Sequence, residues 1–320
     1  MGQKLNIDQL RIYHVYYTYG WGKLYEDFSS NNNDYNMESY HVSKKEIVKE
    51  MAYEVLVLDI DGTLTNSKKE ISEKTLEAVI NAQKEGIKVV IASGRPTAGI
   101  KEIAKKVKLD EYGGYVLSYN GGKITNFKTK EVIYNETLPR EMIPAIYEEA
   151  VEHKVGIVTY EGNDAIAGNG IDEYNQLEAR INGIGLREVE DFPKYVRFPV
   201  NKCLLTGEPS HMAEVEQKMK ERFGNFLNIY RSEDFFVEVM PQNIDKAYSL
   251  GKLLKYLGLD RSQMIACGDG FNDLSMIKYA GLGVAMANAQ EVVKKAADYI
   301  TLSNDEDGVA KVIYKFMLNE

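Results

Sequence analysis

Cysteine is scarce in this sequence, and its scarcity excludes two common kinds of site. Only Cys203 and Cys267 occur, far apart and without another cysteine or a histidine at metal-ligand spacing. Neither a disulfide framework nor a zinc site is therefore supported. Unpaired cysteines are typical of proteins in a reducing compartment, so we expect a cytoplasmic protein.

Long apolar runs are also missing. No stretch approaches the roughly 18 consecutive apolar residues of a membrane span, and the N-terminus lacks the continuous apolar segment of a secretory signal. Met1-Gly2 is the start of an N-myristoylation motif, but Asn6 stands where that motif requires Ser or Thr. We expect no membrane association and no export.

An excess of basic residues is the third absence. The chain has 39 Lys and Arg against 48 Asp and Glu, which gives a net charge of −9. Affinity for nucleic acid depends on Lys and Arg that neutralise phosphates, so we expect no nucleic-acid partner. Any phosphate that this protein handles is expected to be on a small molecule.

The remaining composition is that of an ordinary globular protein, with 44% hydrophobic and 27% charged residues in 320. This length corresponds to about two domains. Residues 1–50 stand apart because they are rich in tyrosine and poor in aliphatic residues. We predict that they form a leader that is either a dispensable extension or the product of an upstream start. The alternative is an aromatic segment, containing Trp21, that docks on a partner.

From residue 51 onward, predicted strands and helices alternate. The apolar run at 53–58 is typical of a buried strand in a parallel sheet. Ser72 is placed to cap a helix that runs to residue 85. The other predicted elements of this alternation are strands at 87–92, 115–119, 264–267, 282–286 and 299–301, and helices at 247–257 and 272–280. This order predicts a parallel α/β sheet with right-handed crossovers.

A long stretch of mixed helices and strands interrupts the alternation. Residues 137–231 are enough for a domain of their own. We therefore predict one core sheet, built from residues 51–136 and 232–320, with an α+β insertion at 137–231 that lies over the strand ends as a lid.

Two carboxylates follow the first predicted strand. Asp59 and Asp61 are one residue apart, and in an extended chain such residues point to the same side. Gly62 permits a tight turn there, and Thr63 adds a hydroxyl. Two like charges at one strand end are costly unless a cation or a proton separates them. The pair therefore indicates a divalent-metal site or a shared acid–base role, with a solvated acidic turn as the alternative.

A second acidic pair follows the predicted strand at 264–267. Asp269 and Asp273 lie in the segment Gly-Asp-Gly-Phe-Asn-Asp, where Asn272 or Asp273 could cap the next helix. Capping does not explain Asp269. If the two strands that precede these acidic segments are neighbours in a parallel sheet, their carboxyl ends bring together three groups suited to Mg²⁺, namely Asp59, Asp61 and Asp269.

A cation and a hydroxyl complete the set of candidate residues. Lys246 follows Asp245 in the first turn of a predicted helix, where the helix dipole opposes a cation unless an anion is near. Ser93 and Gly94 end another strand and could form a phosphate cradle. The alternatives are an exposed lysine and a serine helix cap.

These segments together resemble the haloacid dehalogenase superfamily, in its Cof-type sugar-phosphatase branch. The first and fourth motifs carry most of the resemblance, which extends from residue 51 to residue 320. The matching motifs are Asp59-Ile60-Asp61-Gly62-Thr63-Leu64, Ser93-Gly94-Arg95, Lys246 and Gly268-Asp269-Gly270-Phe271-Asn272-Asp273, together with Asn120-Gly121-Gly122 and the segment 283–289.

The resemblance implies a Rossmann-like, doubly wound parallel sheet with an inserted α+β cap of type IIB, and a Mg²⁺-dependent phosphatase. It implies that Asp59 attacks phosphorus and becomes an aspartyl-phosphate, and that Asp61 acts as acid and base. The implied metal-binding residues are Asp59, Asp61 through its backbone carbonyl, Asp269 and, as a supporting group, Asp273. The implied phosphate-binding residues are Ser93, Gly94, Lys246 and Asn272.

We therefore expect a phosphatase that releases phosphate from small phosphorylated metabolites, sugar phosphates in particular. A phosphomutase on the same scaffold is the first alternative, and a non-catalytic metabolite-binding regulator is the second. The cap is expected to set specificity. Glu161, Asn163 and Arg180 are candidates for that role, with ordinary surface positions as their alternative. The oligomeric state is left open.

Overall fold

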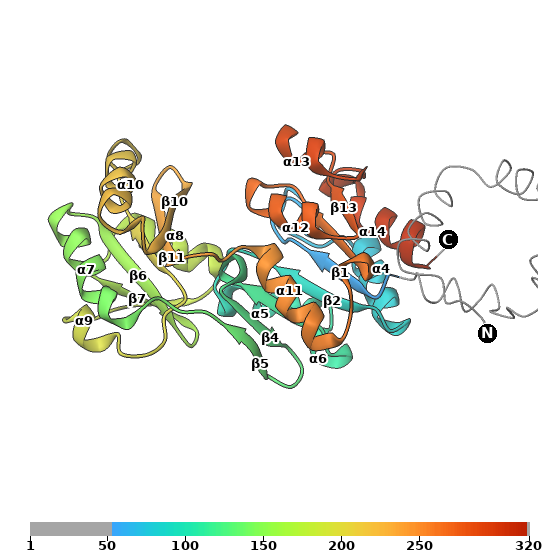
Figure 1. The fold of residues 1–320 in the computed structure, drawn as a ribbon, viewed down its shortest axis with the longest axis horizontal. Coiled ribbons are helices and arrows are strands. Elements are labelled where there is room, and N and C mark those ends of the chain that lie inside the picture. The colour runs from blue at the N-terminus through green and yellow to red at the C-terminus, as the bar shows by residue number, and fades with distance from the viewer. Residues whose placement is uncertain (1–52, 319–320) are drawn as a thin grey trace, which may run out of the picture. The chain divides into compact units, whose positions relative to one another are not determined.

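The computed structural model describes residues 53–318. The predicted leader at 1–50 lies outside these residues. The described chain builds two sheets, one of eight strands and one of six. Figure 1 shows the strands of each sheet and the helices that lie beside them.

The eight-stranded sheet is the predicted core. Its first six strands run parallel and the last two are antiparallel to their neighbours. In spatial order the strands are β14 (Tyr299–Ile300), β13 (Leu282–Ala285), β12 (Met264–Gly268), β1 (Val55–Leu58), β2 (Lys88–Ala92), β3 (Tyr115–Ser118), β4 (Lys123–Asn126) and β5 (Val132–Asn135). Strands β1 and β12 are buried along their whole length, as their continuous apolar sequences predict. The hairpin β4–β5 was not predicted, because it follows Asn120-Gly121-Gly122 without a long apolar run.

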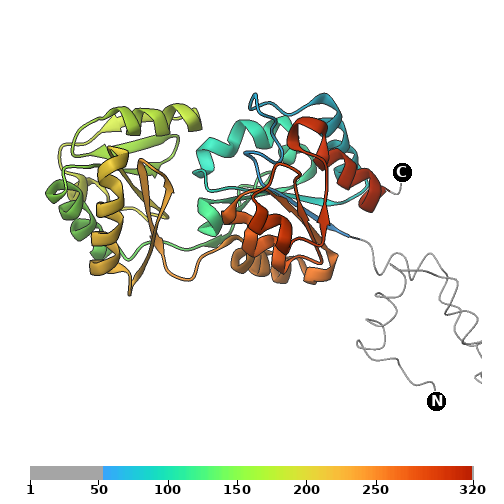
Figure 2. The same cartoon turned by 90° about the horizontal axis from the view of Figure 1, so that it is seen from above.

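Helices cover both faces of the core sheet, as Figure 2 shows, which is the doubly wound arrangement that the sequence predicts. Helix α4 (Glu73–Lys84) packs against α14 (Gly308–Ile313), and α11 (Lys246–Leu257) packs against α12 (Leu274–Tyr279). Ser72 caps α4 by accepting a hydrogen bond from the Thr75 amide. The other core helices are α5 (Thr97–Lys106), α6 (Leu109–Tyr112) and α13 (Glu291–Ala296).

The six-stranded sheet belongs to the inserted cap. Its spatial order is β10 (Leu227–Glu233), β11 (Phe236–Pro241), β9 (Cys203–Thr206), β6 (Gly156–Glu161), β7 (Asp164–Gly168) and β8 (Gly185–Glu188). The predicted cap boundary at residue 231 is wrong. It falls inside β10, and the next strand, β11, pairs with β9 of the same sheet. The return to the core therefore comes after Pro241.

The two faces of the cap sheet have different coverings, because successive side chains alternate in direction. One face carries Ile157, Cys203, Leu205, Val237 and Val239, which pack against the cap helices in one hydrophobic cluster. These helices are α7 (Ile143–Glu152), α9 (Phe192–Tyr195) and α10 (Pro209–Phe223). The alternate residues lie on the other face, to which α8 (Glu173–Asn182) contributes Tyr174.

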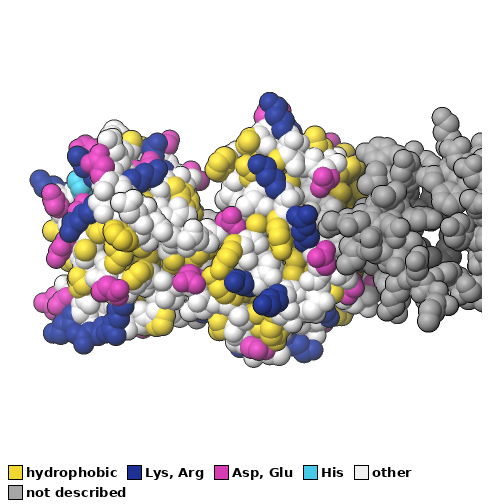
Figure 3. All heavy atoms as spheres, in the orientation of Figure 1, with side chains coloured by type: hydrophobic (Ala, Val, Ile, Leu, Met, Phe, Trp, Pro, Cys, Tyr) yellow, Lys and Arg dark blue, Asp and Glu magenta, His cyan; other side chains and the backbone are white. Residues whose placement is uncertain are grey.

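Figure 3 shows basic and acidic side chains on both the cap and the core. Among residues 53–318, no helix is both long enough and apolar enough to cross a membrane. Both cysteines are buried and unpaired.

Candidate active site

The two acidic segments meet at the carboxyl ends of neighbouring parallel strands. Strands β1 and β12 pair in register, with Leu58 opposite Cys267, and the Asp59 amide donates to the Cys267 carbonyl at 3.1 Å. This is the strand adjacency that the sequence analysis assumed. The loops that leave these strands hold Asp59 and Asp269 close together.

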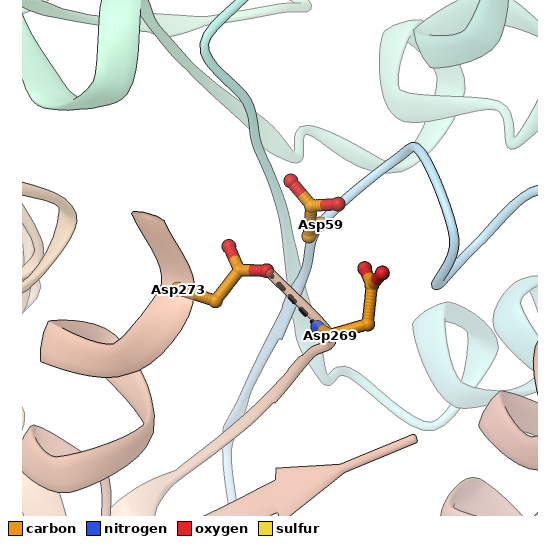
Figure 4. A group of neighbouring side chains, drawn as sticks. All are labelled: Asp59, Asp269 and Asp273. Atoms are coloured by element: carbon orange, nitrogen blue, oxygen red, sulfur yellow. Dashed lines mark hydrogen bonds between the residues drawn. The ribbon is translucent and has the colours of Figure 1, made fainter. Parts of the chain in front are cut away.

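Three carboxylates converge at this point, as Figure 4 shows: Asp59, Asp269 and Asp273. One oxygen of each lies within 4.8 Å of the others. Asp273 is fully buried and Asp59 is 5% exposed. Three like charges this close and this buried repel one another, so the group favours a cation or retained protons.

Lys246 provides one cation for this group. Its Nζ donates to Asp59 Oδ1 at 2.8 Å, to Asp273 Oδ1 at 2.6 Å and to the Ala92 carbonyl at 2.9 Å. The side chain is completely buried, so the alternative of an exposed lysine is wrong. Lys246 is the first residue of α11, whose N-cap is Asp245. The unfavourable helix dipole is thus offset by two carboxylates.

Asp273 is fixed by a second set of hydrogen bonds. Its Oδ2 accepts from the amides of Asp269 and Gly270, both at 3.0 Å. Gly270 is the N-cap of a short 3₁₀ turn at Phe271–Asp273, and Asp273 supplies the returning bond of a capping box. Asp273 therefore shapes the loop and contacts the buried lysine, but as the N-cap residue of α12 it makes no side-chain capping hydrogen bond. Its two oxygens are both engaged by protein donors.

Burial changes the protonation of the acidic group. Burial, together with the charge of Asp273, raises the pKa of Asp59 to about 8, although Lys246 opposes the shift. Burial and Asp273 raise the pKa of Asp269 to about 6. Burial would lower the pKa of Lys246, but the Asp273 and Asp59 carboxylates outweigh it and raise that pKa. A divalent cation would replace the retained protons, and hard carboxylate oxygens suit such an ion.

Asp61 has a different environment from Asp59. Arg95 donates to both of its oxygens, at 2.9 Å and 2.8 Å, and Lys69 donates to Oδ1 at 3.0 Å. Burial opposes ionisation, but Arg95 and then Lys69 outweigh it and lower the pKa of Asp61. The Asp61 carboxylate is not part of the close group of three. Alternation along an extended chain predicts that both carboxylates point to the same side. Because β1 ends at Leu58, Asp59 and Asp61 lie in the turn after the strand, where each carboxylate has different hydrogen-bond partners.

The turn after Asp61 is built around the fourth motif. Gly62 has a φ of +82°, and a Cβ added there would lie 2.3 Å from Asp269 Oδ2. Thr63 Oγ1 donates to Asp269 Oδ1 at 3.0 Å. Gly62 therefore serves both the turn that the sequence predicts and the approach of a carboxylate 207 positions away in the chain.

The second motif lies beside these groups. Ser93 is buried, and its Oγ accepts from the Arg95 amide at 3.2 Å. The alternative of a serine helix cap is wrong, because the N-cap of α5 is Pro96. The Ser93 carbonyl accepts from the Asn120 amide at 3.0 Å, and a Cβ on Gly94 would lie 3.0 Å from the Asn120 side chain.

Asn272 reaches the same loop from the fourth motif. Its Nδ2 donates to Asn120 Oδ1 at 3.2 Å. Ser93, Gly94 and Asn272 thus lie on loops that contact one another through Asn120, and Lys246 is the first residue of α11. Lys246 belongs to the same region. Its ammonium bridges the Ala92 carbonyl at the end of β2 and the carboxylates of Asp59 and Asp273.

Several residues of this region were not predicted as site residues. Arg95 and Asn120 belong to motifs that carry the family resemblance, so the sequence contained a signal for both residues. No motif includes Lys69. Of the suggested cap candidates, Asn163 and Arg180 are exposed, and Glu161 pairs with Arg187. Cap residues that hydrogen-bond to the core loops include Lys202, Tyr230 and Asn201, at Gly94, Asn120 and Gly122.

Comparisons with known proteins agree with this geometry. Residues 56–313 match the family of haloacid dehalogenase-like hydrolases. A solved haloacid dehalogenase-like hydrolase from Bacteroides thetaiotaomicron is 51% identical, with a TM-score of 0.80 over 82% of this chain and 99% of that one. The sugar phosphatase BT4131 of subclass IIB is 26% identical, with a TM-score of 0.70 over 82% of this chain and 98% of its own.

A curated relative points the same way. The 5-amino-6-(5-phospho-D-ribitylamino)uracil phosphatase YcsE of Bacillus subtilis strain 168 is 32% identical over 266 residues, which are 82% of this chain and 96% of that protein. Phosphatases of this family generally use a divalent metal, and the buried acidic group suits one. This chain belongs to the haloacid dehalogenase-like hydrolases and is a phosphoric monoester hydrolase with a Rossmann-like α/β core.

Proposed function

We propose that this enzyme is a Mg²⁺-dependent phosphatase of small phosphorylated metabolites, with sugar phosphates as its substrates, and that Asp59 is its nucleophile. The observation that carries the proposal is the contact of buried Lys246 with Asp59 and Asp273, beside Asp269. This arrangement combines a positioned carboxylate, a fixed cation and a candidate metal site at one strand end.

Asp59 and Asp269 are the proposed side-chain ligands of Mg²⁺, with the Asp61 backbone carbonyl as a third group by family resemblance. Asp273 supports them, because its own oxygens already accept from Lys246 and from two loop amides. When bound, Mg²⁺ would neutralise charge on the transferring phosphoryl group. It would also offset the burial and the repulsion that raise the pKa values of Asp59 and Asp269.

The proposed reaction has two displacements at phosphorus. In the first, an Asp59 oxygen forms a bond to phosphorus as the bond to the leaving-group oxygen breaks, and protonated Asp61 gives its proton to that oxygen. In the second, Asp61 removes a proton from water, the water oxygen attacks phosphorus, and the bond to Asp59 breaks to release inorganic phosphate. Asp61 is protonated again at the end, so the proton count balances.

Lys246 has two tasks in this scheme. Its bond to Asp59 Oδ1 orients the nucleophile, and its charge compensates the negative charge that accumulates near phosphorus. Ser93, Gly94 and Asn272 are proposed to hold the phosphoryl oxygens. Among the described residues, Asp59 Oδ2 accepts no hydrogen bond from a protein donor, which suits an attacking oxygen.

The names of two relatives support the proposed substrate class. The subclass IIB relative is named as a sugar phosphatase, and the Bacillus subtilis relative is named for a phosphorylated ribityl compound. We carry this class of phosphorylated polyhydroxyl compounds over to the present enzyme. The absence of cysteine pairing supports a cytoplasmic location. We also propose that residues 1–50 are dispensable for catalysis.

The test is phosphate release from a panel of sugar phosphates and nucleotides, with Mg²⁺ or with EDTA. The full chain is compared with Asp59→Asn and with a chain that starts at Met51. We expect release that requires Mg²⁺, is lost in Asp59→Asn and is retained when residues 1–50 are absent. Isomerised substrate without free phosphate would instead support a phosphomutase, and no reaction with any substrate would contradict the proposal.

A further inference from the structure

A line of hydrogen bonds joins the cap to the phosphate-site loops. Asn272 Nδ2 donates to Asn120 Oδ1 at 3.2 Å, and Asn120 Nδ2 donates to the Tyr230 hydroxyl at 2.9 Å. Tyr230 in turn donates to Glu238 Oε2 at 2.8 Å, and Lys202 pairs with Glu238 Oε1 at 3.3 Å. We call Asn272, Asn120, Tyr230 and Glu238 the amide relay.

The cap end of the relay is a built and buried feature. Glu238 is 5% exposed and Lys202 is 3% exposed. Tyr230 and Glu238 are direct partners across the β10–β11 ladder, on the face opposite the helix-packed cluster. A buried ion pair with a satisfied hydroxyl is held in one geometry, because breaking any member would leave an unpaired polar group in a dry region.

The direction of each hydrogen bond is fixed from this end. A carboxylate that lacks a proton only accepts, so Tyr230 must donate to Glu238. Burial and the Glu238 charge raise the pKa of Tyr230 well above its ordinary value, so the phenol keeps the proton that it donates. The Met240 sulfur also lies 3.5 Å from this hydroxyl, but a thioether is the weaker acceptor.

A tyrosine that donates its one proton to Glu238 can only accept from Asn120. The Asn120 amide must therefore turn its Nδ2 toward Tyr230 and its Oδ1 toward Asn272. That oxygen in turn requires Nδ2 of Asn272 on its side, rather than the amide oxygen. Only one of the two N–H groups of Asn272 is used in this contact, which leaves the other for a phosphoryl oxygen.

The Asn120 backbone has an unusual conformation, and contacts with neighbouring loops hold it in place. It adopts a left-handed conformation with a φ of 50°, next to Tyr119 at 54°, which is unusual for two consecutive residues that are not glycine. The Asn120 backbone amide donates to the Ser93 carbonyl, and its side chain would lie 3.0 Å from a Cβ on Gly94. Asn120 thus touches both phosphate-binding loops and the cap.

We propose that Tyr230 and Glu238 are positioning residues, which act through Asn120 to present an N–H of Asn272, rather than its oxygen, to the substrate phosphate. The relay crosses from core to cap at one hydrogen bond, between Asn120 and Tyr230. The phosphate site is therefore complete only when the cap is seated on the core. This inference rests on the proposed role of Asn272 in phosphate binding.

The test uses inorganic phosphate as the probe, in the presence of Mg²⁺, with binding measured by calorimetry and as product inhibition. Tyr230→Phe removes only the hydroxyl. We expect it to weaken phosphate binding about five- to tenfold, the effect of about one hydrogen bond, and to lower kcat/KM by a similar factor for every substrate. The matched control is Tyr160→Phe, which removes a cap hydroxyl that donates to Glu178 outside the relay. It should leave phosphate affinity unchanged.

A double-mutant cycle separates positioning from a merely structural role. In an Asn272→Ala background, Tyr230→Phe should cause no further loss of phosphate affinity, because the group that it orients is gone. Glu238→Gln is the second variant and should weaken phosphate binding in the same direction, even if Tyr230→Phe does not fold. Unchanged phosphate affinity in both variants, losses that multiply in the cycle, or a loss confined to particular substrates would overturn the proposal. If the unaltered enzyme neither binds nor releases phosphate, the proposed function fails instead.

Discussion

The Cβ that Gly62 lacks would lie 2.3 Å from Oδ2 of Asp269, closer than nonbonded atoms approach. The loop after β1 and the loop after β12 therefore fit together only because position 62 has no side chain. Gly62 also has a φ of +82°, a backbone conformation that is unfavourable for residues with a side chain.

Gly62→Ala is expected to lower activity at least about tenfold, because the methyl group must push Asp269 away from Asp59. The matched control is Gly86→Ala. Gly86 has a similar φ of +92° but nothing within 4 Å of an added Cβ, so it suffers the backbone strain alone. Each variant should lose about 1–2 kcal/mol of stability from that strain. Phosphate release and chemical unfolding measure the two effects, and equal activities in the two variants would contradict the steric argument.

Asp59→Asn should abolish phosphate release while the protein stays folded. The amide cannot form an acyl-phosphate, yet its oxygen can still accept from Lys246. The raised pKa keeps the Asp59 carboxyl largely protonated in the metal-free protein, and asparagine matches the size and the neutral state of that group, so we expect no loss of thermal stability. Circular dichroism and a phosphate assay with Mg²⁺ are sufficient. Normal turnover in this variant would refute the nucleophile assignment.

The stability of the metal-free enzyme should fall as pH rises. The pKa of Asp59 is raised to about 8 in the folded state, above the ordinary value of 3.8, so the folded state holds the proton more firmly than the unfolded chain. Stability that depends on this proton is present at low pH and is lost as pH rises toward the folded-state pKa. The Asp269 pKa of about 6 acts in the same direction.

Thermal unfolding in EDTA between about pH 5 and about pH 9 measures this effect. Addition of Mg²⁺ should stabilise the protein more at the upper end of the range, because the metal competes with the retained protons. Asp59→Asn should flatten the dependence. A metal-free stability that rises across the range in the unaltered protein would show that these carboxylates are not protonated as described.

Arg95 should set the acid limb of the pH–rate profile. Its two hydrogen bonds to Asp61 are a main reason why the pKa of that carboxyl is lowered. Arg95→Gln should raise the Asp61 pKa and move the acid limb for hydrolysis of the aspartyl-phosphate to higher pH, since the Asp61 carboxylate that the first displacement leaves must stay unprotonated to activate water. Lys69→Gln is the control and should cause a smaller shift, because the Lys69 side chain is 67% exposed and makes one hydrogen bond. An unmoved acid limb in Arg95→Gln would contradict this control of Asp61.

Lys202→Met should destabilise the enzyme by about 3–5 kcal/mol, because it leaves Glu238 buried without a counter-charge. The side chains of the two partners are only 4% and 7% exposed. Adding Glu238→Leu to this variant should recover much of the loss. Lys218→Met is the control, since its pair with Glu221 is half exposed, and it should change stability by less than about 0.5 kcal/mol. Denaturant unfolding measures all three, and equal effects of the two single variants would contradict the burial argument.

The sequence by itself determined the core of this protein, because its signals are local. Apolar runs marked β1 and β12, Ser72 marked a helix start, and the motif residues stood directly after strands. Parallel strands place their carboxyl ends at one edge of the sheet, so the proximity of Asp59 and Asp269 could be predicted from the sequence. The family resemblance then supplied roles for Lys246, Ser93, Gly94 and Asn272, which remain proposals.

The tertiary structure decided what depends on contacts between distant segments. Burial of Lys246 against Asp59 and Asp273, the capture of Asp61 by Arg95, and the extension of the cap through β11 leave no local pattern. The same is true of the cap residues at the site. Alternation along β11 shows that Glu238 shares a face with Phe236, but which face meets the core depends on how two sheets and their helices pack. Packing of that kind is a property of the whole chain and is not encoded in any single segment.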